Sequence, residues 1–219
     1  MIIYSNTGLG NRLRVLFSYY YLYKNNKITM VWDKNKACPG LFLDYFKQLD
    51  NVIFIDNIPE KIDIKTNSQN SNTKNIFIYK DLKLKDYLQE IINNNIKNLQ
   101  KYIAIHIRRT DTISCPKKKN AYLSDEEYIN FINKYPDYNI YIATDNYETQ
   151  NKFYNLFKDR IKIINLIKQP SKYIPSIRQT SLEDTIIDIY MCVGATMFLG
   201  SSYSSLTTLI DDLRKNINI

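Results

Sequence analysis

Apolar residues follow two different rhythms along the first half of the chain. Short runs rich in β-branched and aromatic residues predict strands at residues 2–4, 28–32 and 52–55. Apolar positions at helical spacing predict helices over residues 9–20, 41–49 and 84–99. The segment 66–75 contains no apolar residue and is predicted to be a surface loop. Strands that alternate with helices in this way indicate parallel βαβ units.

The second half repeats the alternation more regularly. Apolar runs predict four strands, at residues 102–107, 139–143, 161–164 and 196–199. The accompanying helices are predicted to start at 124, to span 147–157, to run from 181 to 193 and to end near 213. Ser124 and Glu127 have the spacing of a capping box, and Ser181 and Asp184 have a weaker version of it. Gly194 is predicted to end its helix in the left-handed conformation.

These elements predict an α/β fold with two small Rossmann-like halves, 1–98 and 99–219, and a cleft between them. The length of 219 residues allows one domain or two small ones. A chain of this length buries about 70% of its unfolded surface, so its fold requires neither disulfides nor a metal.

The composition is that of a globular protein. Apolar residues make up 44% and charged residues 24% of the chain, which excludes wholesale disorder. The 30 Lys and Arg residues exceed the 22 Asp and Glu residues, and the resulting charge of +8 raises a nucleic-acid partner as one interpretation. The basic residues are spread along the chain and form no stripe with aromatic residues, so this interpretation is the weaker one.

Cysteine usage and hydropathy indicate the compartment. Cys38, Cys115 and Cys192 lie far apart and form no CxxC pair, which indicates neither a disulfide framework nor a zinc knuckle. No stretch approaches about 18 uninterrupted apolar residues, and the first residues lack the features of a signal peptide. We therefore expect a cytoplasmic protein without a membrane span.

The strongest functional signal follows the predicted strand at 102–107. Its apolar run is typical of a central parallel strand, and ligands bind beyond the carboxyl ends of such strands. Period-two alternation places His106 and Arg108 on one face and turns Arg109 away from it. A guanidinium at this edge suits a pyrophosphate, because its planar fork makes two parallel hydrogen bonds. The alternatives are that both arginines pair with local carboxylates and that His106 is structural.

A second candidate anion site is the turn 200–205, which contains Ser202, Ser204 and Ser205. It joins a predicted strand to a predicted helix, so free backbone N–H groups and the helix dipole favour an anion there. The alternative is that the serines cap the helix without a ligand.

Two carboxylates could complete a ligand site. Asp188 lies in a largely apolar helix, where a buried carboxylate needs a donor. A nucleobase or a ribose could supply that donor, and so could a neighbouring backbone group or lysine. Asp145 ends another predicted strand at the same sheet edge, where it could instead cap the next helix.

Other motifs carry less chemistry. The turn at 8–12 is not GxGxxG and lacks the spaced acidic residue of a dinucleotide site, so no redox nucleotide is predicted. With a single histidine and no metal-ligand spacing, we expect no metal. Lys117–Lys119 is interpreted as a solvated charge run.

Three segments together resemble the fucosyltransferase superfamily, which includes α-1,6-, nodulation, α-1,2- and protein O-fucosyltransferases. They are Gly8-Leu-Gly-Asn-Arg12, His106-Ile-Arg-Arg-Thr-Asp111, and Asp188 followed by 200–205. HxRRTD is the most specific, because it is similar to the hallmark of the α-1,6 group. Residues near it, at 122–128, 144–145 and 178–180, are also similar to that group.

The resemblance implies a GT-B-like fold and an inverting transfer that needs no metal and no cofactor. The donor would be GDP-fucose or a related GDP-sugar, and the acceptor a glycan or another hydroxyl compound. Residues 99–219 would bind the donor, and residues 1–98 would form the acceptor side and supply the loop with Asn11.

The resemblance also implies roles for single residues. Arg108 would bind the diphosphate of the donor and stabilise its departing charge. The other implied donor-binding residues are Asn11, His106, Asp111, Asp145, Asp188, Ser202, Ser204 and Ser205. Of these, Asp188 would contact the base or ribose, and Ser204 and Ser205 the phosphates.

The chain also departs from the α-1,6 group. It is shorter than most members, and Asn146 stands where that group has a second aspartate. No carboxylate aligns with the proposed base of the group, so Asp111, Asp33 and Glu126 are candidates only because a carboxylate can accept the proton of the acceptor. A catalytically weak or inactive module that binds GDP-sugars or glycans is therefore the main alternative.

Overall fold

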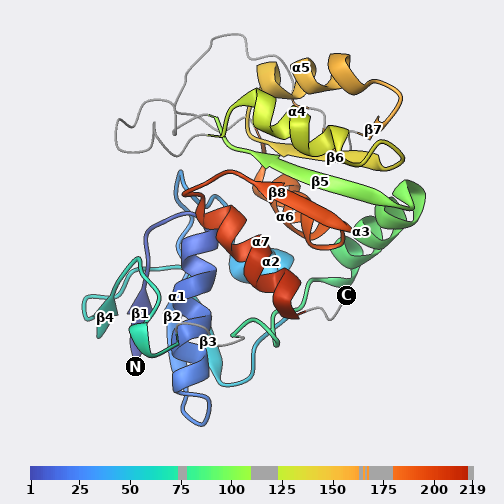
Figure 1. Ribbon diagram of the computed structural model, residues 1–219. Coiled ribbons are helices and arrows are strands. Elements are labelled where there is room, and N and C mark those ends of the chain that lie inside the picture. Colours follow the sequence, from blue (N-terminus) through green and yellow to red (C-terminus); the bar gives the residue numbers. More distant parts are fainter. Residues whose placement is uncertain (74–77, 110–122, 163–164, 166, 168–179, 217–219) are drawn as a thin grey trace. The chain divides into compact units, whose positions relative to one another are not determined.

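The computed structural model describes residues 1–73, 78–109, 123–162, 165, 167 and 180–216 (Figure 1). The chain divides into two compact units, Met1–Gln89 with Asp212–Ile219 and Glu90–Asp211. Each unit is built on its own parallel sheet of four strands. This confirms the predicted α/β class.

The first unit contains a sheet in the order β3-β2-β1-β4. Its strands are β1 (Ile2–Tyr4), β2 (Ile28–Val31), β3 (Val52–Ile55) and β4 (Ile64–Lys65). Its helical elements are α1 (Leu9–Leu22), α2 (Phe42–Tyr45) and the 3₁₀ turn η1 (Ser71–Thr73). The helix predicted over 41–49 is thus a single turn, because Phe46 is extended and forms a β-bridge with Leu84. Strand β4 was not predicted, since two residues give no periodic signal.

The second unit repeats this strand order as β7-β6-β5-β8, with every neighbouring pair parallel. Its strands are β5 (Tyr102–Ile107), β6 (Asn139–Thr144), β7 (Ile161–Lys162) and β8 (Met197–Gly200). Its helices are α3 (Asp86–Leu99), α4 (Asp125–Asn133), α5 (Tyr147–Phe157), α6 (Leu182–Val193) and α7 (Ser205–Asn216). In both units the first strand in the chain therefore lies inside the sheet, between the second and the fourth.

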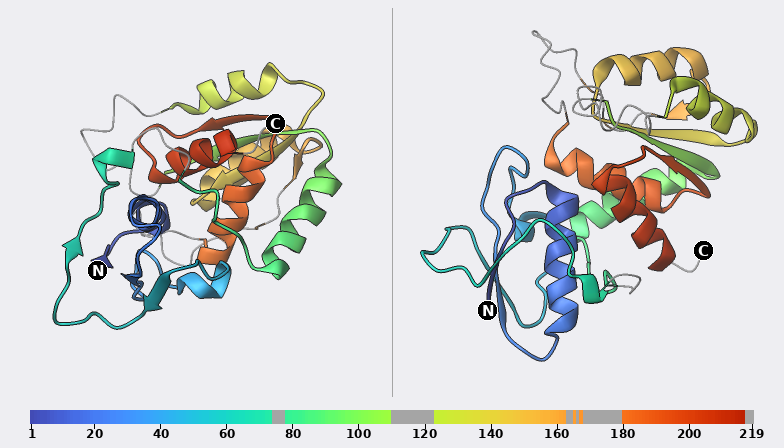
Figure 2. Two further views of the ribbon diagram at one scale, coloured as in Figure 1. Left: turned by 90° about the horizontal axis from the view of Figure 1, so that it is seen from below. Right: turned by 60° about the vertical axis from the view of Figure 1, so that its left-hand side comes forward.

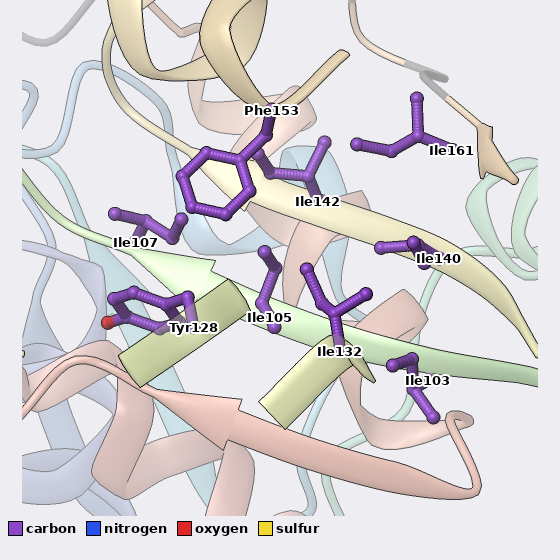
Figure 3. Close-up of a cluster of buried hydrophobic side chains, with 9 residues drawn as sticks. All are labelled: Ile103, Ile105, Ile107, Tyr128, Ile132, Ile140, Ile142, Phe153 and Ile161. Carbon is purple, nitrogen blue, oxygen red and sulfur yellow. The ribbon is translucent and has the colours of Figure 1, made fainter. Parts of the chain in front are cut away.

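Helices cover both faces of the second sheet, with α4 and α5 on one face and α6 on the other (Figures 1 and 2). Alternate residues of β5 and β6 point toward α4 and α5 and form a buried cluster of isoleucines and aromatic rings (Figure 3). The members of that cluster are Ile103, Ile105, Ile107, Tyr128, Ile132, Ile140, Ile142, Phe153 and Ile161. The intervening residues, among them Tyr102 and His106, are left for the α6 face. Strand periodicity thereby decides which side chains of β5 belong to the core and which can reach a ligand.

Two helix starts and one helix end test the capping predictions. Both capping boxes are present, with Ser124 paired to Glu127 at α4 and Ser181 paired to Asp184 at α6. The prediction for Gly194 was wrong, because this residue ends α6 in the right-handed conformation at φ −76°. It has a steric reason to be glycine, since a Cβ would lie 2.8 Å from Ile96 Cδ1 and 2.9 Å from the Tyr102 hydroxyl.

The boundary between the units differs from the expected division at 98/99. Most of α3 belongs to the second unit, where Ile96 packs beside Gly194 at the end of α6. The last residues, from Asp212, belong to the first unit. The two compact units are therefore not two continuous halves of the sequence, because the first unit includes both ends of the chain.

Candidate functional site

A pocket opens in the second unit where β5 and β6 end and α7 begins. Its empty volume, including the open mouth, is about 360 Å³. It is lined by His106, Arg108, Thr144, Asp145, Thr180, Thr185, Asp188, Ser204 and Leu206. The pocket thus brings together five of the predicted site residues from four separate parts of the chain.

Ser201 fixes the end of β5, from which two of the lining residues project. Its backbone N–H and its hydroxyl both donate to the carbonyl of His106, at 2.9 and 3.1 Å. The backbone N–H of Arg108 donates to Ser201 Oγ at 2.8 Å. The Tyr128 hydroxyl, 2.9 Å from Ser201 Oγ, also donates to the His106 carbonyl at 3.2 Å. This network holds the backbone on either side of Ile107 and so sets the direction in which Arg108 leaves the strand.

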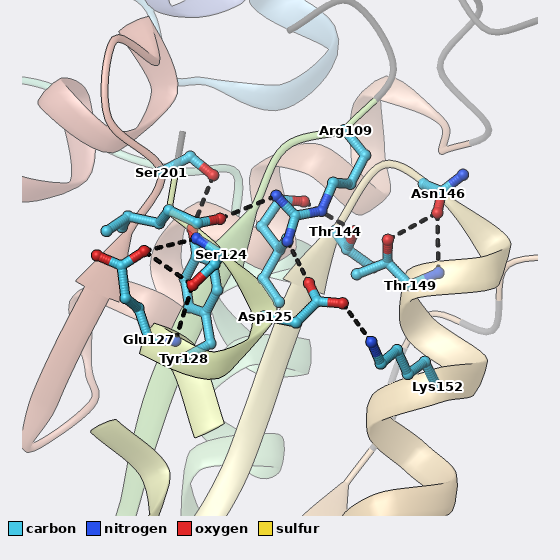
Figure 4. A network of polar contacts seen from close by, with 12 residues as sticks. Arg109, Ser124, Asp125, Glu127, Tyr128, Thr144, Asn146, Thr149, Lys152 and Ser201 are labelled. Carbon is cyan, nitrogen blue, oxygen red and sulfur yellow. Dashed lines mark hydrogen bonds and ion pairs between the residues drawn. The ribbon is translucent and has the colours of Figure 1, made fainter. Parts of the chain in front are cut away.

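Arg109 points away from the pocket, as period-two alternation predicted. Its guanidinium forms an ion pair with Asp125 and donates to the carbonyl of Leu123 at 3.2 Å (Figure 4). It also lies 5.8 Å from the centre of the Tyr128 ring. The alternative that these arginines pair with a local carboxylate therefore holds for Arg109, which anchors the start of α4.

Asp125 joins this anchor to a second helix. Its other oxygen accepts from Lys152 Nζ on α5 at 2.5 Å. Partial burial opposes ionisation, but the hydrogen bonds from Lys152 and Arg109 outweigh it and lower the pKa of Asp125. The carboxylate thus ties α4 and α5 to the residue that follows Arg108.

His106 is buried on the α6 face of the sheet and lines the pocket together with Arg108. Its Nδ1 lies 2.8 Å from the hydroxyl of Thr207 on α7. This hydrogen bond fixes the orientation of the imidazole ring. His106 therefore has a structural partner and a place at the pocket, so the two interpretations of it are compatible.

Asp188 lines the pocket although only 7% of the residue is exposed. Its Oδ1 accepts hydrogen bonds from the Tyr141 hydroxyl at 2.5 Å and from Asn165 Nδ2 at 3.3 Å. Burial raises the pKa of the carboxyl to about 8, although the Tyr141 hydrogen bond lowers it. Among the described residues, the donors to the Asp188 carboxyl are thus the side chains of Tyr141 and Asn165, and not a backbone group or a lysine. With a pKa of about 8, this carboxyl changes its charge near neutral pH.

Asp145 and Asn146 follow β6 and have different roles. Asp145 lines the pocket, and its Oδ1 accepts from the backbone N–H of Arg109 at 2.9 Å. Asn146 is the residue that caps α5, since its Oδ1 accepts from the backbone N–H of Thr149 at 2.8 Å (Figure 4). The alternative that Asp145 serves only as the helix cap is therefore wrong.

The three candidate serines are not equivalent. Ser204 is buried, lines the pocket and caps α7, where its Oγ accepts from the backbone N–H of Thr207 at 3.4 Å. Ser202 is exposed, and Ser205 is the half-buried first residue of α7. Neither of these two is among the residues that line the pocket. Capping and pocket lining thus coincide in Ser204 alone of the three.

Asn11 belongs to the first unit, where its Oδ1 accepts from Arg14 at 3.4 Å. The neighbouring Arg12 is fully buried and donates to the carbonyl of Thr7 at 2.8 Å and to Asp33 Oδ1 at 2.9 Å. Asp33, a candidate base, is therefore held in an ion pair. This buried arginine joins the loops that follow β1 and β2.

Several predicted residues lie outside the described residues. They are Asp111, Lys117–Lys119, Tyr122, Arg178 and Gln179. Glu126, the remaining candidate base, is exposed on α4. The pocket-lining carboxylates within the described ranges are Asp145 and Asp188.

Sequence reasoning missed three residues that shape the site. Thr207 positions His106, Tyr141 meets Asp188, and Thr185 lines the pocket one turn before Asp188. The i, i+3 spacing of Thr185 and Asp188 could have revealed a shared helix face. Thr207 and Tyr141 had no such signal, because their partners are distant in sequence.

Neither a metal-binding cluster nor a membrane-spanning helix is found in the described ranges. They contain no group of three or more His, Cys, Asp and Glu side chains arranged to hold a metal ion. Nor do they include a helix that combines the length and the hydropathy needed to cross a bilayer. The absence of a bound metal and the cytoplasmic location both stay predictions.

One family model matches most of this chain by sequence. The sequence model of the family described as GDP-fucose protein O-fucosyltransferase matches residues 14–216. A search of curated proteins by sequence gives no significant match.

Solved structures with the same fold include two kinds of fucosyltransferase. The NodZ α-1,6-fucosyltransferase soaked with GDP-fucose is 13% identical, with a TM-score of 0.63 over 97% of this chain and 92% of that one. The fucosyltransferase NodZ from Bradyrhizobium is also 13% identical and has a TM-score of 0.62, over 96% and 92% of the two chains. POFUT1 in complex with GDP is 9% identical, with a TM-score of 0.61 over 99% and 96%. A GT-B-like fold is consistent with these matches.

Proposed function

The chain belongs to the GDP-fucose protein O-fucosyltransferase family, and on that premise we propose that it transfers fucose from GDP-fucose to a hydroxyl group of a glycan or another acceptor. The transfer inverts the anomeric carbon and needs no metal. The pocket at the ends of β5 and β6 is the proposed donor site.

One observation carries this proposal. A single pocket contains a guanidinium, the capped start of a long helix and a buried carboxyl, supplied by Arg108, Ser204 and Asp188. A nucleoside diphosphate presents the complementary groups, since its phosphates accept from the guanidinium and the helix start and its nucleoside donates to a carboxylate. His106 and Asp145 line the same pocket and are the further groups proposed to contact the nucleotide.

The same groups suit the chemical step. In a direct displacement, the acceptor oxygen bonds to the anomeric carbon while the bond from that carbon to the diphosphate breaks. The sugar passes through an oxocarbenium-like state, and negative charge grows on the departing diphosphate. Arg108 and the N-terminus of α7 stabilise that growing charge more strongly than they stabilise the bound donor. This difference accelerates the step. In this proposal they provide the positive charge for which other enzymes use a metal ion.

The acceptor hydroxyl must lose its proton to a base, which we leave unassigned. Asp33 is paired with Arg12, and Glu126 is exposed on α4. Asp111 remains the third candidate. A module that binds GDP-sugars without transferring them is the second candidate function, because the carboxylates of the described pocket are engaged in hydrogen bonds with Arg109 and Tyr141.

A ligand panel followed by a transfer assay tests the proposal. We expect GDP and GDP-fucose to raise the melting temperature of the purified protein, since a ligand at about 100 times its dissociation constant stabilises the native state by about 2.7 kcal/mol. UDP-sugars are the matched control. Stabilisation by UDP without stabilisation by GDP would overturn the assignment of the donor.

Transfer and donor hydrolysis are then measured with candidate acceptors, with and without EDTA. Fucose transfer that persists in EDTA is the expected result. Loss of transfer in EDTA, restored by a divalent cation, would contradict the metal-independent step. Binding of GDP-fucose with neither transfer nor hydrolysis would favour the binding module.

A further inference from the structure

Tyr141 and Asp188 meet at the buried side of the pocket. Tyr141 lies on β6, is 1% exposed, and donates its hydroxyl to Asp188 Oδ1 at 2.5 Å. Asn165 donates to the same oxygen at 3.3 Å. Both donors thus engage Oδ1, and no described residue donates to Oδ2.

We propose that Tyr141 is a positioning residue for nucleotide binding. By holding Oδ1, its hydroxyl fixes the carboxyl group of Asp188 so that Oδ2 accepts a hydrogen bond from a donor on the nucleoside. The inference rests on the proposed function, because it requires a nucleoside diphosphate in this pocket. It adds a residue that touches no ligand and acts through Asp188.

The position of Asp188 is supported by both of its donors. The Tyr141 hydroxyl holds it from the sheet, and Asn165 also donates to the Asp184 carbonyl on the same helix at 3.2 Å. Asn165 is itself held, since its carbonyl accepts from Gln150 on α5 at 2.8 Å. A carboxyl held in this way loses little conformational freedom when a ligand binds, which favours affinity.

The hydrogen bond from Tyr141 also affects the protonation state of the Asp188 carboxyl. Burial raises the pKa of Asp188 to about 8, and the Tyr141 hydrogen bond acts against that rise. The surrounding titratable and charged groups are Asp184 and Cys192 on α6, Tyr141 and Asp145 from β6, and Tyr102, His106 and Arg108 from β5 and its exit. Asp184 and Asp145 raise the pKa further. Burial keeps the pKa of Tyr141 well above its usual range, so its hydroxyl remains a donor.

Nucleotide binding is therefore linked to the loss of a proton from Asp188. A donor on the nucleoside favours the carboxylate, so the affinity for GDP should rise with pH until Asp188 is ionised in the empty pocket. With a pKa of about 8, the expected gain between pH 7 and pH 8.5 is about five- to tenfold. Removing the Tyr141 hydroxyl should move this rise to higher pH.

The chain supplies a matched control for this substitution. Tyr102 lies on the neighbouring strand β5, and its buried hydroxyl donates to the carbonyl of Met191 on α6 at 2.7 Å. Tyr141→Phe and Tyr102→Phe each remove one buried hydroxyl that bonds to α6. Only the first changes a bond to the carboxyl of Asp188.

The experiment measures the dissociation constant of GDP by calorimetry from pH 7 to pH 8.5 for wild type, Tyr141→Phe, Tyr102→Phe and Asp188→Asn. We expect Tyr141→Phe to bind about tenfold more weakly than wild type at pH 7, with the difference shrinking at higher pH, and Tyr102→Phe to follow wild type. Asp188→Asn should lose the pH-dependent gain and serves as the baseline for titration of GDP itself.

The possible failures are distinguishable. If wild type binds GDP but Tyr141→Phe and Tyr102→Phe have the same pH profile, the positioning role is wrong and the proposed function stands. If wild type does not bind GDP, the proposed function itself fails. Circular dichroism at each pH verifies that all four proteins are folded.

Discussion

Arg108 and Arg109 are adjacent in the chain but serve different parts of the molecule. Arg108 lines the pocket, and Arg109 pairs with Asp125 at the start of α4. Their separation follows from the alternation of side chains at the end of β5. One arginine thus lines the pocket, while its neighbour anchors the start of α4.

We expect Arg108→Lys to be nearly as damaging as Arg108→Ala. An ammonium group cannot form the bidentate contact that a guanidinium makes with a diphosphate. Loss of such a stabilising group costs about 10²–10³ in rate. Fucose transfer by both purified variants provides the measurement, and wild-type transfer by Arg108→Lys would disprove the role.

Thr207→Val should impair the enzyme through His106. The substitution keeps the shape of the side chain but removes the hydroxyl that lies 2.8 Å from His106 Nδ1. We expect kcat/KM for GDP-fucose to fall about tenfold, as for the loss of one hydrogen bond that orients a functional group. Thr208→Val is the control, because the Thr208 hydroxyl donates to the Ser204 carbonyl within α7. Equal effects of the two substitutions would point to α7 as a whole and not to His106.

Strand β8 and helix α7 approach each other closely at Gly200, which faces His106 in the register of the sheet. A Cβ at this position would lie 2.4 Å from Thr207 Cγ2 and 2.7 Å from Thr207 Oγ1. The next turn of chain contains Tyr203 in the left-handed conformation at φ 54°. The elements that form this side of the pocket are thus packed at a distance that only glycine permits.

Gly200→Ala should therefore destabilise the protein and reduce transfer together. The added methyl group overpacks the contact between β8 and α7, at a cost of about 1–3 kcal/mol. The double variant Gly200→Ala/Thr207→Ala should recover most of the stability, but little of the transfer, since the hydroxyl that meets His106 is gone. Urea denaturation and transfer assays of the three variants measure this, and additive losses of stability would contradict the steric explanation.

At the scale of the whole molecule, a buried carboxyl should leave a signature in the pH dependence of stability. Asp188 has a pKa of about 8 in the folded protein and an ordinary value near 4 when unfolded. Between these values the folded state keeps a proton that the unfolded state loses, so its free energy of unfolding falls as pH rises, by at most about 1.4 kcal/mol per pH unit. The lowered pKa of Asp125 acts in the opposite sense only at more acidic pH.

Asp188→Asn removes this titration. We expect the variant to be more stable than wild type at pH 8 and the difference to shrink toward pH 5. Urea midpoints at pH 5, 6.5 and 8 provide the measurement. A stability advantage that instead grows toward acidic pH would show that Asp188 is ionised in the folded protein.

The sequence by itself determined the elements and much of the chemistry. Strands such as β5 and helices such as α5 have long periodic patterns, and capping boxes have fixed spacings, so local physics defines them. Alternation along β5 also separated Arg108 from Arg109. The segment 41–49 was misjudged because its apolar residues fit a helix, whereas packing of Phe46 beside Leu84 ends the helix after one turn.

Only the tertiary structure decided which partners those side chains meet. Tyr141 reaches Asp188 across 47 residues of sequence, and His106 reaches Thr207 across 101. The tertiary structure also decided that Ser204 lines the pocket while Ser202 is exposed. It placed Ile96 and Tyr102 so close to Gly194 that a Cβ at this position would clash with them. Contacts over such distances depend on how strands and helices pack, and no local pattern encodes them. The predicted cleft between the halves and the roles of the site residues stay predictions.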